Sequence, residues 1–270
     1  AHYDLGNDFY KLWLDPSMTY SAALFKTDTE SLQQAQFNKN QRILEMLNPS
    51  PGDHIIEIGC GWGGFAEHAL QQKDVQIHGV TLSEEQLRWS RNRMKVAGLS
   101  KRADISLTDY RDLISQYDGV VSIEMFEAVG EQYWDTYFET LKRILKPGAS
   151  VVLQVISIDD KRFQTYRKQA DFIQRYIFPG GMLPSIEALQ DKISEQGFVL
   201  QEKQLFGPDY ARTLRAWQTK FEQSSEQLKT LGYDESFQRL WRYYLSYCEG
   251  GFEEGSINVG LYKFSKSNEF

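Results

Sequence analysis

The sequence predicts an α/β fold with a doubly wound parallel sheet and helices on both of its faces. Short apolar runs alternate with segments of helical periodicity from about residue 30 to residue 158, which is the pattern of a parallel sheet. The apolar run His54–Ile58 is followed by glycines at positions 59, 61, 63 and 64, which allow a tight turn between a strand and a helix. No break in composition divides the 270 residues, so we expect one domain, residues 1–270.

The first half of the chain contains most of the predicted sheet. The first 30 residues are rich in aromatic and turn-forming residues, and they predict short helices in an irregular arm. Apolar spacing predicts a helix over 30–47 that ends before Pro49, and Leu32 and Phe37 begin its apolar series. After the strand 54–58 and a helix over 65–73, the expected elements are strands at 75–80, 103–107, 119–123 and 149–158 and helices at 84–97 and 133–145.

From Asp159 onward the alternation lapses into a long insertion. The sequence predicts an amphipathic helix over 161–175, an apolar turn over 176–183 and a helix over 185–196 that Ser185 caps. The remaining expected elements are a strand at 198–205, two long helices at roughly 210–229 and 234–249, and a last strand at 257–264.

Composition and charge exclude several classes of function. A net charge of −7 speaks against non-specific binding of nucleic acid and against a uniformly basic membrane-binding face. The 2 cysteines and 4 histidines show neither a disulfide framework nor metal-ligand spacing, which fits a reducing cytoplasm and predicts no metal site. No apolar run approaches the ~18 residues of a membrane span. We therefore expect no transmembrane segment.

One basic segment is interleaved with aromatic residues. A surface that touches anionic lipid headgroups has this composition, and so does a solvated helix face, so both interpretations stay open. The basic residues are Lys161, Arg162, Arg167, Lys168 and Arg175, and the aromatic residues are Phe163, Tyr166, Phe172 and Tyr176.

The glycine turn is the first candidate binding site. A helix N-terminus behind glycines suits a nucleotide-like ligand, although the spacing matches neither GxxxxGK[ST] nor a clean GxGxxG. Glu57 favours a ligand there, because a carboxylate buried without a partner is costly. After the second strand, Thr81 and Gln86 are candidates for ribose hydroxyls, while Ser83 also predicts a helix N-cap.

Six segments of the chain, in order, resemble the cyclopropane-fatty-acyl-phospholipid synthases and their mycolic-acid-modifying relatives. They are HYDLGNDFYKLWLDPSMTYSAALF, EIGCGWGGFAEHA, GVTLSEEQ, VSIEMFEAVG, QRYIFPGGMLPS and YLSYCEGGF. The resemblance implies a Rossmann-like, seven-stranded class I methyltransferase sheet whose last strand returns antiparallel. It also implies an N-terminal helical arm and a helical insertion that form a lipid pocket.

The same resemblance implies an enzyme that uses S-adenosyl-L-methionine to modify the cis double bond of an unsaturated phospholipid acyl chain, giving a cyclopropane. The enzyme would be cytoplasmic and peripheral at the inner membrane face, and a homodimer is compatible with it. Relatives often carry an N-terminal domain, so we expect the chain to be a fragment of a longer protein. Carried over by motif, the cofactor contacts are Tyr3, Tyr20, Ser21, Glu57, Gly59, Gly61, Thr81, Leu82, Gln86, Tyr110, Arg111 and Ile123.

For catalysis, the resemblance implies a bound bicarbonate ion that removes a proton from a carbocation. The matching positions are Glu127, Ile156 and Tyr210, while Ala22 stands at a cysteine position and Gln154 at a histidine position. Gln154 can donate a hydrogen bond but cannot carry charge or shuttle a proton. Glu124, directly after the fourth strand, is interpreted as a structural or cofactor-side acid.

Three alternatives remain open at this point. The departures at Ala22 and Gln154 allow a related enzyme that gives a methyl-branched or otherwise unsaturated product. An amine N-methyltransferase is a second alternative, because some plant alkaloid methyltransferases share the scaffold. A cofactor-binding module without activity would show a damaged glycine loop or the loss of Glu127, and the sequence shows neither.

Overall fold

The computed structural model describes residues 5–267, and these contain a seven-stranded sheet in the order β3-β2-β1-β4-β5-β7-β6. β7 runs antiparallel to both of its neighbours, whereas β1 to β5 are parallel. The predicted sheet, including the antiparallel return of the last strand, is therefore confirmed. The strands are β1 His54–Ile58, β2 Gln76–Thr81, β3 Ala103–Leu107, β4 Tyr117–Ile123, β5 Leu145–Ile158, β6 Phe198–Leu205 and β7 Ile257–Lys266.

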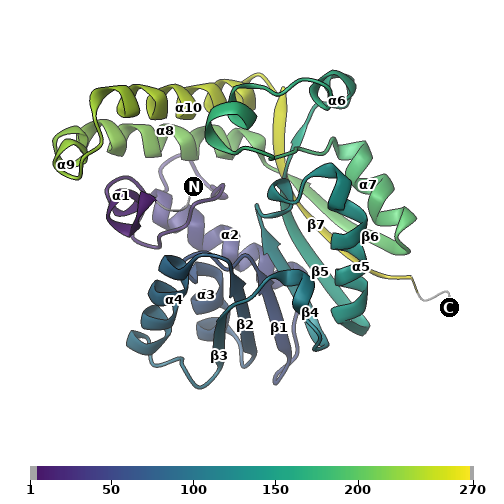
Figure 1. Ribbon diagram of the computed structural model, residues 1–270. Coiled ribbons are helices and arrows are strands. Elements are labelled where there is room, and N and C mark those ends of the chain that lie inside the picture. The colour runs from purple at the N-terminus through teal and green to yellow at the C-terminus, as the bar shows by residue number, and fades with distance from the viewer. Residues whose placement is uncertain (1–4, 268–270) are drawn as a thin grey trace.

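Helices cover both faces of this sheet (Figure 1). Successive strand residues point to opposite faces, so Ile55 belongs to one hydrophobic core and Ile56 to the other. The first core receives side chains from α2 (Leu32–Leu47), α3 (Gly64–Gln72) and α4 (Glu84–Val96). The second core receives them from α5 (Trp134–Ile144) and α7 (Ile186–Glu195).

The remaining helices lie outside this layered unit. The long helices α8 and α10 pack on each other, and the N-terminal arm with α1 lies between them and the sheet (Figure 1). Among residues 5–267, no helix has both the length and the apolar character that crossing a bilayer requires. The helices of this part are α1 Asn7–Lys11, α6 Asp160–Tyr166, α8 Gly207–Gln223, α9 Ser225–Thr230 and α10 Glu235–Glu253.

The prediction of a single helix over 161–175 is wrong, because the chain forms two separate helical segments there. α6 ends at Tyr166, and a π-helical turn follows at Ile173–Ile177. The side chain of Asp171 accepts a hydrogen bond from the Gln174 N–H at 2.9 Å, and the Gln174 side chain accepts one from the Asp171 N–H at 3.0 Å. Such a reciprocal pair starts a new helix, so the apolar periodicity alone does not reveal the break.

Two other boundaries differ from the prediction. The helix expected over 210–229 begins at Gly207 and is interrupted at Ser224, whose hydroxyl donates to the Leu12 carbonyl at 3.0 Å. β5 begins at Leu145, four residues before the expected start. Leu145 already pairs with Tyr117 of β4, and the register of the two strands then shifts between Tyr117 and Gly119. Proline is tolerated at such irregularities, so Pro147 does not end the strand.

The apolar series predicted for α2 departs from its buried face at Phe37. Phe37 is 43% exposed and packs its edge against His68, while Gln36, Lys39 and Asn40 are buried. The first turns of α2 therefore present polar side chains to the arm. The last turns, including Ile43, pack on the sheet as expected.

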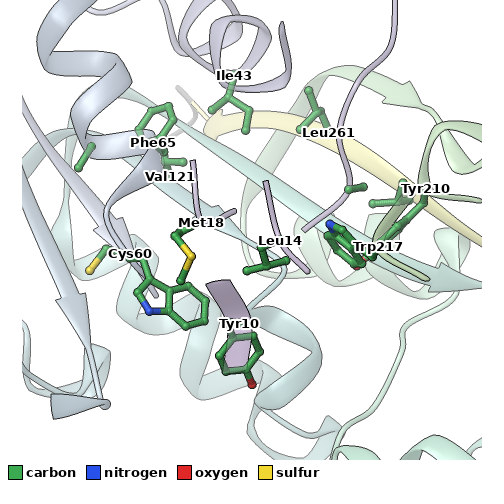
Figure 2. Close-up of a cluster of buried hydrophobic side chains, with 14 of the residues drawn as sticks. Tyr10, Leu14, Met18, Ile43, Cys60, Phe65, Val121, Tyr210, Trp217 and Leu261 are labelled. Atoms are coloured by element: carbon green, nitrogen blue, oxygen red, sulfur yellow. The ribbon is translucent and has the colours of Figure 1, made fainter. Parts of the chain in front are cut away.

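The first core extends beyond the sheet. Figure 2 shows side chains of the arm, the sheet and α8 in one buried cluster. The cluster includes Tyr10 and Leu14 of the arm, Val121 and Leu261 of the sheet, and Trp217 of α8. The arm is thus part of the folded core and holds a fixed place beside the sheet.

The two faces of α2 predict different effects of truncation. Ile43→Ala removes a fully buried side chain and should lower the free energy of unfolding by about 2–5 kcal/mol. Phe37→Ala on the same helix is the matched control and should cost about 1 kcal/mol or less. Urea unfolding monitored by circular dichroism measures both, and equal losses would contradict the assigned orientation of α2.

Candidate functional site

A cavity of about 660 Å³ lies at the carboxyl ends of β1, β2 and β4. In open parallel sheets this edge is where ligands bind, and the volume is in the range of small-molecule sites. The walls come from the arm, the first turns of α2, the glycine turn and the segments that follow β2, β3 and β4.

The glycine turn has a conformation that requires glycine. Gly59 has a φ of 80° and Gly61 a φ of 52°, in the left-handed region that other residues rarely adopt. A Cβ atom at position 59 would also lie 2.9 Å from Cγ of Met125. The backbone N–H groups of Gly59 and Cys60 donate to the Val80 carbonyl at 2.9 and 3.0 Å, which ties the turn to β2.

The cavity gathers the predicted cofactor-binding residues that lie in the described part of the chain. Tyr3 lies outside the described residues. The predicted residues that line the cavity are Tyr20, Ser21, Glu57, Gly59, Gly61, Thr81, Leu82, Gln86, Tyr110, Arg111 and Ile123. Their location agrees with a shared site, and their role in binding stays a prediction.

Two of the polar candidates are coupled to each other. The Thr81 hydroxyl donates to Oε1 of Gln86 at 2.8 Å, and Ser83 caps α4 by accepting from the Gln86 N–H. The predicted N-cap is therefore confirmed. Arg111 points its guanidinium to Asp109, whose oxygens accept at 3.0 and 2.6 Å, so its charge is already neutralised.

A buried acid and a buried base line the same cavity. Burial raises the pKa of Glu57 to about 8 and lowers the pKa of Lys39 to about 8. Lys39 donates to the Ser21 hydroxyl at 2.8 Å, and within residues 5–267 Glu57 Oε2 has no partner. No signal in the sequence marks Lys39, because it stands in the polar run QFNKNQ of α2.

At the inner end of the cavity, donors from three segments of the described chain meet on the carboxylate of Glu124. The Ala22 N–H donates to Oε1 at 2.8 Å, the Gln154 side-chain amide donates to Oε1 at 2.7 Å, and the Tyr210 hydroxyl donates to Oε2 at 2.6 Å. Glu124 has a φ of 48°, so its backbone lies in the left-handed region. Glu124 is partly buried, and it forms part of the cavity wall.

Glu127 has a different environment. Its Oε1 accepts from the Ile156 N–H at 2.6 Å, and within residues 5–267 its Oε2 has no partner. Burial raises the pKa of Glu127 to about 8, and the negative charge of Glu124 adds to this effect. Glu127 therefore keeps a proton at neutral pH.

The residues predicted for catalysis thus divide between two acids. Ala22, Gln154 and Tyr210 converge on Glu124, whereas Ile156 bonds to Glu127. The interpretation of Glu124 as a structural or cofactor-side acid missed its central position. Its place directly after a strand was visible in the sequence, but its left-handed φ was not.

Comparisons of sequence and of structure with known proteins agree on one family. The family model described as mycolic acid cyclopropane synthetase matches residues 1–262. The chain is similar to tuberculostearic acid methyltransferase UfaA1 from Mycobacterium tuberculosis, with 42% identity over 96% of this chain and 62% of that protein. It is similar to cyclopropane-fatty-acyl-phospholipid synthase from Escherichia coli, with 40% identity over 99% of this chain and 67% of that protein. The chain thus spans about two thirds of the length of these relatives.

Solved structures agree with this grouping. The mycolic acid cyclopropane synthase CmaA1, in a complex with S-adenosylhomocysteine and CTAB, has a TM-score of 0.92 and 31% identity over 98% of this chain and 96% of its own. The cyclopropane synthase MmaA2 from Mycobacterium tuberculosis has a TM-score of 0.91 and 30% identity over the same shares of 98% and 96%. Coclaurine N-methyltransferase, at 19% identity over 98% of this chain and 80% of its own and a TM-score of 0.80, shares the fold.

The raised pKa of Glu127 predicts a pH-dependent stability. Between its ordinary value of 4.5 and about 8, the folded carboxyl holds a proton that the unfolded one has lost, so the free energy of unfolding falls as pH rises through this window. Glu127→Gln, which mimics the protonated acid, should reduce that fall by about 1 kcal/mol or more. Unfolding in urea at several pH values between pH ~5 and ~8 measures the effect.

The control is Glu139→Gln, at an exposed glutamate of α5 that should leave the slope unchanged. Some slope will remain in the Glu127 variant, because Glu57 has a pKa raised in the same direction. A slope identical to that of the unaltered protein would contradict a protonated Glu127.

Proposed function

The chain belongs to the mycolic acid cyclopropane synthetase family, and on this premise we propose that it transfers a methyl group from S-adenosyl-L-methionine to the cis double bond of an unsaturated phospholipid acyl chain. One observation carries the proposal. The glycine turn and the Glu124 carboxylate line the same cavity, so a cofactor bound at the turn would lie beside a buried acidic cluster.

The residues around the cavity fit this cofactor. S-adenosylmethionine, when bound, supplies an electrophilic methyl group on a sulfonium. Lys39 and Glu57 line the cavity where a zwitterionic amino-acid end would lie, and Glu57 Oε2 has no partner within the described chain. An ammonium bound beside Glu57 would lower its raised pKa and favour the carboxylate. Gln86, whose Oε1 accepts from Thr81, lines the same cavity and would meet the ribose hydroxyls.

The chemistry that this chain must supply concerns a proton. An alkene is a neutral nucleophile, so no base is needed to activate it. Once the alkene has used its π electrons to bond the methyl carbon, the acyl chain carries a positive charge and must lose one proton. Glu124, which lines the cavity and has Glu127 three residues further along the chain, is the group that can receive it.

The proton that leaves decides the product. A proton lost from the new methyl group lets its C–H electron pair close a cyclopropane, and similarity to the Escherichia coli enzyme named for that product favours this outcome. A proton lost from another carbon leaves an alkene beside a methyl branch. Similarity to the relative named tuberculostearic acid methyltransferase favours this second candidate.

Access to membrane lipid would come from an aromatic surface on the insertion and α10, formed by Phe172, Tyr176, Tyr243 and Tyr247. Phe172 packs against the other three rings with centroid distances of 4.6–5.6 Å. Tyr176 is 64% and Tyr243 55% exposed. Exposed Lys161, Arg162, Lys168 and Arg175 lie on the same insertion, and this combination suits an anionic headgroup layer.

Incubation with methyl-labelled S-adenosylmethionine and phospholipids with cis-unsaturated chains tests the proposed activity. We expect each modified fatty acid to gain one methylene unit. Loss of the alkene identifies a cyclopropane, and a retained alkene identifies the branched product. Mass spectrometry of the released fatty acids distinguishes the two. Label in an added amine, with none in lipid, would instead identify an N-methyltransferase and overturn the proposal.

Two glycine variants connect this activity to the cavity. Gly59→Ala forces a side chain into the left-handed turn and against Met125, so it should lose both cofactor binding and product. Gly98→Ala also places a side chain at positive φ, with no atom within 4 Å of its Cβ, and should keep both. Isothermal titration with S-adenosylhomocysteine reports the binding.

The aromatic surface predicts membrane binding that depends on exposed tyrosines. The double variant Tyr176→Ser and Tyr243→Ser should bind anionic phosphatidylglycerol vesicles several-fold more weakly, because it removes exposed interfacial rings. Ile114→Ser, at a side chain that is 88% exposed elsewhere, is the control and should bind normally. Co-sedimentation with the vesicles measures the binding of both variants. Unchanged binding of the double variant would contradict the role of the aromatic surface in membrane binding.

A further inference from the structure

We propose that the Glu124 carboxylate itself fills the anion site to which the family resemblance assigns a bicarbonate ion, and that this carboxylate is the base that takes the proton from the substrate. The inference rests on the proposed function and specifies which group performs its last chemical step. It makes Glu124 a catalytic residue and removes the need for an external anion.

The donors of the site fit an internal carboxylate and leave no set of donors for bicarbonate. The positions expected to hold the ion include Ala22, Gln154 and Tyr210, and each of them donates to Glu124, at 2.8, 2.7 and 2.6 Å. A bicarbonate placed there would have to take these donors from Glu124 and would then stand beside a second negative charge. The residues present therefore do not fit bound bicarbonate.

The backbone at Glu124 supports a functional assignment independently. Its φ of 48° lies in the left-handed region, which is strained for a residue other than glycine. Among the described residues, Met18 and Asn48 share a positive φ, but neither presents a buried charge. Strain of this kind persists where the surrounding structure holds it, and here it directs a carboxylate into the cavity wall.

The two acids of the cluster have environments that separate their roles. Burial raises the pKa of Glu124, but hydrogen bonds from Tyr210, Ala22 and Gln154 and the charge of Lys39 oppose that rise. Glu127, with its pKa raised to about 8, is the acid that stays protonated. Three donors point to Glu124 and one backbone N–H to Glu127, so a negative charge shared by the pair is better stabilised on Glu124.

The proton transfer is chemically balanced. For ring closure, a C–H bond of the transferred methyl group breaks, and its electron pair bonds the methyl carbon to the cationic carbon. For the branched product, a C–H bond on a carbon next to the cationic carbon breaks, and its electron pair forms the new double bond. In both cases the proton joins Glu124. A carbocation is a very strong acid, so its base needs correct position and negative charge more than high basicity. Glu124 Oε2 accepts from Tyr210 and still has a lone pair for the proton.

The decisive experiment uses Glu124→Gly, which removes the carboxylate and relieves the positive φ. In buffer purged of carbon dioxide, the unaltered protein should keep its rate of lipid methylation. Glu124→Gly should fall by about 100-fold, as expected for loss of a general base. Added bicarbonate should raise the methylation rate of Glu124→Gly at least about 10-fold, because the ion can occupy the site that the carboxylate has left.

Asn48→Gly, which relieves a positive φ at the end of α2, is the matched control and should keep its rate with and without bicarbonate. Dependence of the unaltered protein on bicarbonate, or full activity of Glu124→Gly in purged buffer, would overturn the proposal.

A binding measurement separates this inference from the proposed function. Line broadening of ¹³C-labelled bicarbonate in NMR should show binding by Glu124→Gly and none by the unaltered protein. If no variant methylates lipid under any condition, the proposed function fails, yet this readout still decides whether Glu124 fills the anion site. Bicarbonate binding by the unaltered protein would reject the inference.

Discussion

The hydrogen bonds to the Glu124 carboxylate join four segments that are far apart in the sequence. The arm contributes Ala22, the end of β4 contributes Glu124, β5 contributes Gln154 and α8 contributes Tyr210. A carboxylate without these donors would be very costly to bury. The arm, the sheet and α8 must therefore be assembled together, and this mutual requirement fixes the inner end of the cavity.

Neighbouring contacts of the arm strengthen this arrangement. The Ala23 N–H donates to the Thr213 hydroxyl at 3.1 Å, and the Phe25 N–H donates to Asp209 at 3.2 Å, so α8 holds the arm at successive positions. From the other side, α2 holds Ser21 through Lys39 and Gln36, each at 2.8 Å. The polar face of α2, which breaks the expected apolar pattern, is thus the face that builds the cavity wall.

The sequence predicts the features that depend on local patterns of residues. It does not predict the features that depend on contacts between distant segments. Strand alternation and the glycines at 59 and 61 are local signals, so the sheet and the turn could be predicted before the structure was known. Lys39 carries no such signal, because its burial follows from the arm that packs on it. The break after Tyr166 depends on the cap at Asp171. Motif matching assigned catalysis to Glu127, which stays a prediction, and it gave Glu124 no catalytic role, because the φ of Glu124 and the direction of its side chain are properties of the folded chain.

The two neighbouring acids, Glu124 and Glu127, differ in charge, so the negative charge beside the cavity has a fixed position. Glu127 is bonded to a single backbone N–H within the described chain and stays neutral, so it adds no repulsion to the charge on Glu124. A diffusible anion could shift or leave, whereas a carboxylate attached to the end of β4 keeps its place relative to the glycine turn. In the proposed reaction, the substrate carbon that faces this oxygen would lose its proton. The choice between a ring and a methyl branch would then be set by how the acyl chain lies against Glu124.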